Sequence, residues 1–147
     1  MKRNRLVELL ALLSLALAIP AAGQTDLGNL SANRLDPDST SNPLGAGSPL
    51  RANGINNPLG VYGSPLSNKS VSNPHATQAP RLYDGAGNYR GRLSTNRLAP
   101  DSTSNPLGRY GSPLSPESIN NPLGAGSPLR YDSPNNPLGQ GWKIEGE

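Results

Sequence analysis

Hydrophobic positions in this chain recur at a long fixed spacing, not at the 3.6-residue period of a helix or the two-residue period of a strand. Leucines in the strings Asn-Pro-Leu-Gly and Gly-Ser-Pro-Leu return every 15 or 16 residues. Such a period is typical of a tandem repeat. It divides the chain into seven units, which span residues 36–50, 51–66, 67–82, 83–98, 99–114, 115–129 and 130–144.

A longer repeat lies over the short one. Residues 30–45 match residues 93–108 at 14 of 16 positions, with an offset of 63. We therefore expect one four-unit block to be present twice in tandem. The expected organisation is a leader over residues 1–23, a first repeat block over 24–82, a second over 83–144 and a C-terminal tail over 145–147.

Each unit carries its own turn residues. In Asn-Pro-Leu-Gly, asparagine bonds the backbone two residues on, proline sets the second turn position and glycine suits the fourth, which predicts a type I β-turn. Gly-Ser-Pro-Leu predicts a second turn. Ahead of the first turn, a proline with an acid beside it predicts one short helical or 3₁₀ turn per unit, which must end before the next Asn-Pro pair. These helical turns are expected to begin at Asp36, Ala99 and Ser115.

The fourth unit departs from this plan. Its pattern predicts a β-hairpin over residues 82–93, with the loop at Gly85–Asn88. For the other units, burying two leucines contributes roughly 3–6 kcal/mol, whereas ordering 15 backbone residues costs on the order of 15–30 kcal/mol. Units must therefore share a core, which predicts an irregular, turn-rich tandem-repeat solenoid with buried leucine stripes. The alternative is a largely disordered low-complexity chain. The stripes would consist of Leu44, Leu59, Leu107, Leu123 and Leu138, and of Leu50, Leu66, Leu114 and Leu129.

The N-terminus has the order of a secretory signal peptide. Basic residues stand at positions 2, 3 and 5, an apolar run follows over residues 6–19, and small residues precede an expected cleavage before Gln24. The apolar run is shorter than the roughly 20 residues of a membrane-spanning helix. We expect an exported product in the periplasm, at the cell surface or secreted, with no membrane span after cleavage.

Composition and charge remove several function classes. Without its leader the chain has nearly equal numbers of basic and acidic residues, so the pI near 9.5 mostly reflects the leader. A basic nucleic-acid-binding face therefore loses its support. The chain has no cysteine, which excludes disulfides, and one histidine, His75, which occupies a leucine slot as a drifted repeat position. We predict no catalytic, cofactor-binding or metal-binding residues, because such sites need converging partners.

A string clearest at Ser102–Leu114, S-x-x-N-P-L-G-x-Y-G-S-P-L, stands beside YDGAGNYRGRLS at residues 83–94. Together they resemble a group of small exported bacterial repeat proteins of uncharacterised function, over nearly all of residues 25–144. In that group the leucine slots are often tyrosine, whereas this chain has leucine. The resemblance implies no catalytic residues.

Carboxylates share one register of the unit, and stacked units would align them with Asn and Ser oxygens. Such an oxygen-rich row could bind Ca²⁺. However, Asn53 and Lys69 fill the same register in neighbouring units, so capping and solvation are the preferred interpretation. The acids concerned are Asp38, Asp101, Glu117 and Asp132, with Asp36 and Asp84 besides.

Three further features have an ordinary explanation beside a functional one. The strings Asp38-Ser39-Thr40 and Asp101-Ser102-Thr103 resemble bacterial O-glycosylation sites, but turn chemistry already explains their serines. Trp142-Lys143-Ile144 is expected to cap the last unit. The tyrosines are expected to pack over the leucine stripes and not to form a binding ladder; they are Tyr62, Tyr83, Tyr89, Tyr110 and Tyr131.

Repetition without a convergent catalytic set favours a non-enzymatic structural or interaction protein of the cell envelope or extracellular space. Its partner is not specified by the sequence; envelope components and self-association are both open. The alternative from another class is a Ca²⁺- or glycan-binding envelope module.

Overall fold

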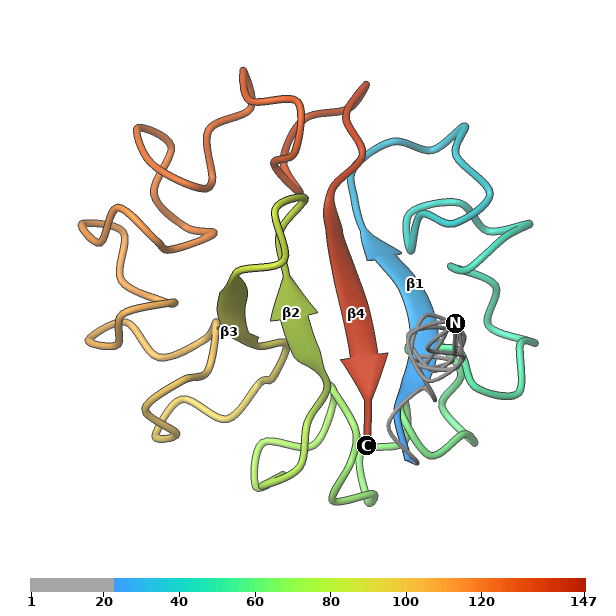
Figure 1. Ribbon diagram of the computed structural model, residues 1–147. Coiled ribbons are helices and arrows are strands. Elements are labelled where there is room, and N and C mark those ends of the chain that lie inside the picture. Colours follow the sequence, from blue (N-terminus) through green and yellow to red (C-terminus); the bar gives the residue numbers. More distant parts are fainter. Residues whose placement is uncertain (1–22) are drawn as a thin grey trace, which may run out of the picture.

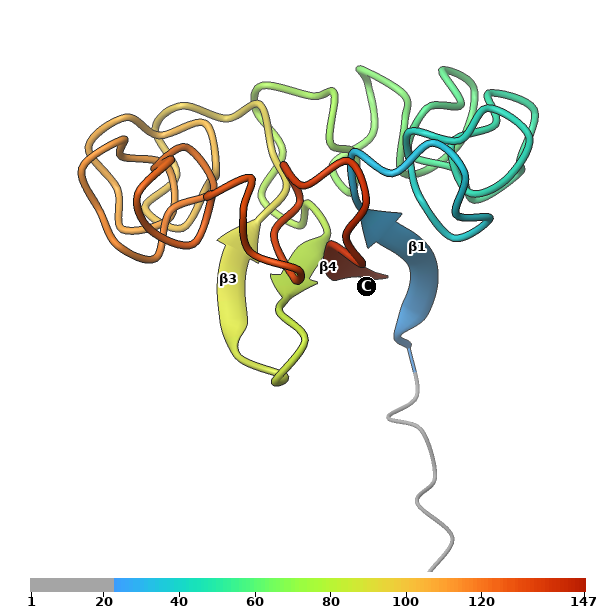
Figure 2. The ribbon, with the colours of Figure 1, turned by 90° about the horizontal axis from the view of Figure 1, so that it is seen from above.

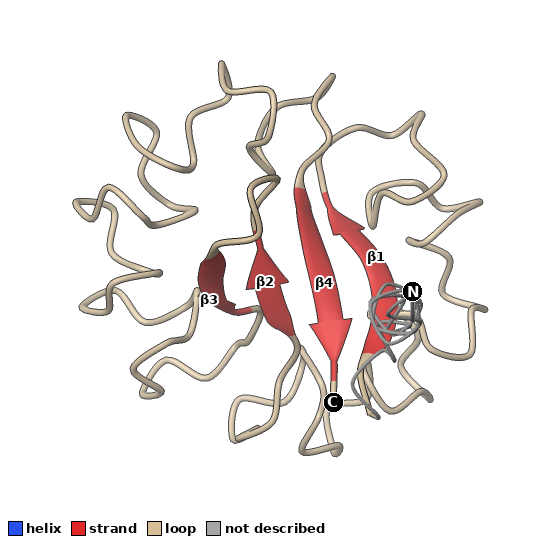
Figure 3. Cartoon of the chain, viewed as in Figure 1, coloured by secondary structure: helices blue, strands red, loops and turns tan. Residues whose placement is uncertain are grey.

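The computed structural model describes residues 23–147, so the predicted signal peptide lies outside the described residues except for Gly23. Four strands form one antiparallel sheet in the order β1-β4-β2-β3 (Figure 1). The strands are β1 (Thr25–Leu30), β2 (Arg81–Tyr83), β3 (Tyr89–Arg92) and β4 (Trp142–Gly146). Figure 3 shows that turns and loops make up everything else in this part of the chain, with no helix.

This architecture corrects the predicted fold class. The chain is neither a solenoid with one helical or 3₁₀ turn per unit nor a disordered chain, but is organised by a small antiparallel sheet. The segments expected to be helical at Asp36, Ala99 and Ser115 form hydrogen-bonded turns instead. At Asp36 the side-chain Oδ1 accepts the N–H of Asp38 at 2.9 Å, which satisfies that donor without a helix.

The hairpin expected at residues 82–93 is present. Strand β2 pairs with β3 in antiparallel register, with Arg81 opposite Arg92 and Tyr83 opposite Tyr89. In its loop, the Asp84 carbonyl accepts the N–H of Gly87 at 2.9 Å. Burial alternates along β2, because Leu82 is fully buried while its neighbours are partly exposed.

Two turn arms, residues 31–80 and 93–141, wind around the sheet (Figure 1), and Figure 2 shows the sheet lying to one side of them. Within an arm, backbone N–H groups donate to the carbonyl three residues earlier, and this bond recurs every three residues. A 15-residue unit therefore consists of five consecutive turns. In the unit 36–50 the donors are Ser39, Asn42, Gly45, Ser48 and, at the start of the next unit, Arg51.

The asparagine before each proline holds its turn from both sides. In the turn Asn105–Gly108, Oδ1 accepts the N–H of Leu107 at 3.0 Å and Nδ2 donates to the carbonyl of Ala99, also at 3.0 Å. The N–H of Gly108 closes the turn on the Asn105 carbonyl at 3.1 Å, which confirms the predicted β-turn. The same pair of side-chain bonds occurs at Asn42, Asn57, Asn73, Asn121 and Asn136.

A second asparagine joins successive units. The Nδ2 group of Asn120 donates to the carbonyls of Thr103 (2.9 Å) and Gly111 (2.9 Å), both in the preceding unit. Asn56 and Asn135 make the equivalent pairs of bonds. Units therefore contact one another through amide–carbonyl bonds and not through leucine stripes.

The leucines lie on the outside, which corrects the predicted core. Leu107 is 94% exposed, and all the leucines of the predicted stripes are exposed to at least 78%. Each follows proline at the tip of a turn, so its side chain points away from the coil. The space inside the coil is filled by small serines with no exposed surface: Ser39, Ser70, Ser102, Ser118 and Ser133. At Ser102, the hydroxyl donates to the Ser94 carbonyl at 3.1 Å, so the buried group is satisfied.

The exposed position of Leu107 determines the expected effect of the substitution Leu107→Asp on stability. A buried stripe would lose several kcal/mol on accepting a charge, but an exposed turn tip should change by no more than about 0.5 kcal/mol. Urea unfolding of wild type and Leu107→Asp measures the difference. The matched variant Ser102→Leu, at a buried position, should lose about 1–3 kcal/mol through overpacking. A large loss for Leu107→Asp alone would contradict the exposed placement.

The two halves of the fold are related by the 63-residue offset seen in the sequence. Strand β1 corresponds to β3, and β2 corresponds to the middle of β4, where the offset is one residue shorter and Leu82 matches Ile144. The sheet order is therefore the same when the halves are exchanged. The isolated bridges Asn29–Ser39 and Arg92–Ser102 are also equivalent. The first half holds β1 and β2, and the second half holds β3 and β4. The first strand of each half pairs with the second strand of the other, since β1 pairs with β4 and β3 pairs with β2.

The same symmetry joins the arms into a ring. The Ala32 N–H, at the start of the first arm, donates to the Pro134 carbonyl near the end of the second, at 2.8 Å. The Thr95 N–H makes the equivalent bond to Val71 at 3.1 Å. Figure 1 shows the resulting succession of turns around all sides of the sheet.

The hydrophobic core lies where the arms meet the sheet. Trp142 and Ile144, expected as a terminal cap, instead occupy the central strand β4 and are at most 1% exposed. Their strand continues through Glu145 and Gly146, which the repeat pattern left in the tail. The remaining buried members of this cluster are Leu27, Ile55, Tyr62, Leu82 and Ala125.

Candidate functional site

The first candidate surface consists of the leucine turns, which we define as the exposed tips that carry the leucines. Exposure of these side chains runs from 78% to 95%. Two such tips occur in a typical unit, one in Asn-Pro-Leu-Gly and one in Ser-Pro-Leu. The set comprises Leu35, Leu44, Leu50, Leu59, Leu66, Leu98, Leu107, Leu114, Leu123, Leu129 and Leu138.

Local bonds fix the backbone of the leucine turns. The N–H of Leu107 donates to Asn105, and the N–H of Leu114 donates to the hydroxyl of Ser112 at 3.2 Å. Proline precedes all the leucines of these turns except Leu35 and Leu98, and its ring fixes φ of the proline itself. The tips are therefore held in one backbone conformation before any partner is present.

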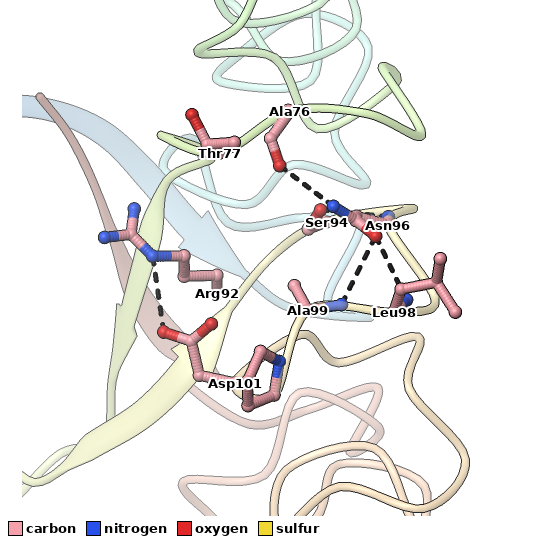
Figure 4. A pocket seen from close by; sticks show the side chains of 9 residues that line it. Ala76, Thr77, Arg92, Ser94, Asn96, Leu98, Ala99 and Asp101 are labelled. Atoms are coloured by element: carbon pink, nitrogen blue, oxygen red, sulfur yellow. Dashed lines mark hydrogen bonds and ion pairs between the residues drawn. The ribbon is translucent and has the colours of Figure 1, made fainter.

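The second candidate surface is a pair of clefts that meet at the ion pair of Arg92 and Asp101. The Arg92 Nε lies 3.3 Å from Asp101 Oδ2. One cleft, of about 350 Å³, lies at the junction between the end of the first arm and the start of the second (Figure 4). In this view Asn96 bridges the two arms: its Nδ2 donates to the Ala76 carbonyl at 3.2 Å, and its Oδ1 accepts the N–H of Leu98.

The other cleft, also about 350 Å³, opens over the sheet beside β2 and β3. It is lined by Arg81, Tyr83, Tyr89, Arg92 and Asp101. The Tyr89 hydroxyl donates to Asp101 Oδ2 at 2.6 Å. Burial raises the pKa of Tyr89, and its hydrogen bond to Asp101 raises this pKa further, so the hydroxyl stays protonated.

Most of the acids considered for Ca²⁺ have arginine partners. Asp84 contacts Arg90 at 2.8 Å, and Glu117 bonds Arg109. Asp132 lies 3.2 Å from Arg130, and Asp101 is paired as described. Residues 23–147 contain no group of three or more acids or histidines placed to hold a metal ion. The geometry therefore supports a role in ion pairing for these carboxylates.

The other sequence candidates are spread over the fold. His75 is exposed at a turn tip, where its N–H bonds Asn73 as leucine does elsewhere. The serines of the proposed glycosylation strings, Ser39 and Ser102, are fully buried, and Thr40 and Thr103 nearly so, which leaves them inaccessible to a transferase in the folded chain.

The tyrosines do not pack over leucine stripes, since those leucines are exposed. Instead, three of them gather: Tyr89 lies 5.8 Å from Tyr83 and 5.5 Å from Tyr110, between ring centroids. Tyr62 is buried in the core, and Tyr131 is 70% exposed.

Sequence reasoning missed Arg81 and Arg92 as site residues. Arg92 lies within the hairpin predicted at residues 82–93, whereas Arg81 lies just before it, and the hairpin prediction did not bring the two together. Their direct opposition depends on the strand register, which a bulge shifts between Arg81 and Tyr83.

Comparison with family models, with curated proteins and with solved structures finds no match for this chain. Within the described part of the chain, no helix has the length and apolar character needed to cross a membrane.

Proposed function

We propose that this chain is an exported, non-enzymatic interaction protein that contacts its partner through the leucine turns. The observation that carries this proposal is the exposure of eleven leucines, each by 78% or more, on hydrogen-bonded turns. Extended apolar surface of this kind, set among polar residues, is typical of protein–protein interaction sites. The signal-peptide pattern at residues 1–23 supports export.

Leucine is not needed to build these turns. Their bonds come from asparagine, serine and the backbone, and His75 occupies one tip with the same backbone bond. An exposed leucine side chain contributes little to the stability of the folded chain. Its presence at nearly every tip is therefore better explained by contact with another molecule.

A partner would gain much from binding these tips. Burying one exposed leucine contributes roughly 1.5–3 kcal/mol. Because the turns are already ordered, little conformational entropy is lost on association. We expect a protein partner with shallow apolar pockets, each of which receives one Pro-Leu tip as an anchor.

Site-specific photo-crosslinking in cells that produce the full-length chain tests the proposal. A benzophenone amino acid replaces Leu44 or Leu107, and a matched control carries it at Asp38, an exposed turn residue without leucine. We expect a discrete protein adduct from both leucine positions and none from Asp38. Mass spectrometry of the adduct then identifies the partner, a second copy included. Equal adduct patterns at all three positions, or none at the leucines, would contradict the proposal.

A further inference from the structure

The face of the sheet turned away from the core carries a row of charges and a row of tyrosines. In antiparallel pairs, directly opposed residues point to the same face. Arg81 lies opposite Arg92 on one side and Glu145 on the other, while Tyr83 lies opposite Tyr89 and Lys143. Leu82, between the two rows, points into the core.

Two arginines directly opposite one another repel and need a bridging anion. The bridge is the side chain of Glu147, whose Oε1 lies 2.5 Å from Arg81 Nη2 and 3.5 Å from Arg92 Nη2. Arg92 is held further by its bond to the Ala79 carbonyl at 2.7 Å. Within residues 23–147 the side chain of Arg81 has no other acid at ion-pair distance, and it stays 40% exposed. Glu147 thus occupies the position that a carboxylate from outside would take.

The tyrosines supply a second kind of contact in the same cleft. The rings of Tyr83 and Tyr89 lie side by side at 56° to one another, and Tyr110 supports Tyr89 edge-on. Aromatic faces of this kind pack against the C–H face of a pyranose ring. Asp101, which accepts the Tyr89 hydroxyl, offers its carboxylate to sugar hydroxyls. A volume of about 350 Å³ suits a small ligand.

The opposed arginines and the neighbouring tyrosines occur at only one of the two equivalent strand pairs, β2 with β3 and not β1 with β4. Across the 63-residue offset, Arg92 corresponds to Asn29 and Tyr89 to Asp26. Strand pairing makes Arg81 equivalent to Lys143 and Tyr83 equivalent to Glu145, because Asn29 lies opposite Lys143 and Asp26 lies opposite Glu145. The equivalent strands β1 and β4 pair without this cluster, so the arginine pair and the tyrosines are not required to build the sheet.

We propose that the Arg81–Tyr83–Tyr89–Arg92 cleft binds a carboxylate-bearing saccharide, such as one uronate unit of an acidic glycan. The arginine pair takes the carboxylate in place of Glu147, and the tyrosines take the ring. Charge-assisted arginine–carboxylate bonds provide the selection against neutral sugars. Stacking on tyrosine provides the selection against bare inorganic anions. This site is separate from the leucine turns and does not depend on them.

Calorimetric titration of the full chain with trigalacturonate, maltotriose and sodium sulfate tests the proposal. We expect trigalacturonate to bind at least about tenfold more tightly than maltotriose or sulfate. Sulfate binding as tight as trigalacturonate would overturn it in favour of a simple anion site. Equal affinity for maltotriose, or no binding of trigalacturonate, would overturn it as well.

Variants separate binding from folding. Arg81→Gln should weaken trigalacturonate binding about tenfold, and Tyr83→Ala should weaken it severalfold. Glu147→Gln should strengthen binding severalfold, because the internal carboxylate no longer competes; loss of a structural residue could not produce this gain. Arg51→Gln, at an exposed position in the first arm, is the matched control and should leave affinity unchanged. Unchanged affinity in both Arg81→Gln and Glu147→Gln would overturn the assignment.

Discussion

Asp84→Ala is expected to destabilise the folded chain by about 3–5 kcal/mol, as for a buried ion pair that loses one partner. The Asp84 carboxylate accepts bonds from the N–H groups of Ala86 (3.0 Å) and Asn88 (2.8 Å) and from two nitrogens of Arg90 (3.0 and 2.8 Å). Without it, the Arg90 side chain, only 13% exposed, would keep its charge in the interior with Glu117 at 3.8 Å as its remaining acid. Urea unfolding at neutral pH measures the loss.

The matched control is Asp132→Ala. Its partner Arg130 is half exposed, so removing this ion pair should cost less than about 1 kcal/mol. Similar losses in the two variants would show that Asp84 and Arg90 are not buried together.

The pH dependence of stability gives a second readout for Asp84. Burial acts to raise the pKa of its carboxyl, but bonds from Asn88 and Arg90 outweigh burial and hold the pKa below its ordinary value. A depressed native pKa stabilises the fold above the unfolded-state pKa of about 4, and this contribution is lost as the pH falls through the native value. Wild type should therefore lose stability between about pH 5 and pH 2 more steeply than Asp84→Ala.

Gly91→Ala is expected to cost about 4 kcal/mol or more, among the largest effects of single substitutions. Gly91 has φ +88°, and a Cβ at this position would lie 2.6 Å from the Asp101 carbonyl oxygen and 2.7 Å from Tyr110 Cβ. Neither the backbone nor the tyrosine can withdraw easily, because the Arg92 N–H bonds the same Asp101 carbonyl at 2.7 Å.

Gly87→Ala separates crowding from backbone conformation. Gly87 has nearly the same φ, +83°, but nothing lies within 4 Å of the position of its Cβ. It should lose only the roughly 1–2 kcal/mol of a left-handed conformation. Chemical denaturation of both variants gives the comparison, and equal losses would rule out the close packing of β3 against the second arm.

Local features of this fold could be predicted from the sequence. The Asn-Pro-Leu-Gly turn and the hairpin around Gly85–Asn88 depend on residues a few positions apart, and both are present. Hydrophobicity alone could not predict that the leucines of the repeat are exposed. Three-residue turns leave too little room inside the coil for leucine, so serine fills it and bonds the carbonyls that would otherwise lack partners.

The sheet was missed because its outer pairing is distant in sequence. Strand β1 pairs with β4, more than a hundred residues later, and neither segment carries a turn signal that links them. One signal was present: Asp26–Ser31 (DLGNLS) aligns with Tyr89–Ser94 (YRGRLS) across the 63-residue offset. Once the hairpin was predicted at the second copy, the offset also indicated a strand at the first.

Of the candidate sites, the leucine turns were identified as positions but assigned to the wrong environment. The cleft between Arg81, Tyr83, Tyr89 and Arg92 was not found, because it depends on the opposition of Arg81 and Arg92 across two strands and on Tyr110 approaching from the second arm. Contacts of this kind follow from tertiary structure and leave no periodic trace in the sequence.

The pairing of β1 with β4 has a consequence for how the chain is made. Synthesis proceeds from the N-terminus, so Thr25–Leu30 emerge before Trp142–Gly146 and have no strand partner until these follow. The hairpin of β2 and β3 can form earlier, but β4, which lies between β1 and β2, is synthesised after the other three strands. Contacts so far apart in sequence form slowly. The sheet therefore stays incomplete until Trp142–Gly146 have left the ribosome.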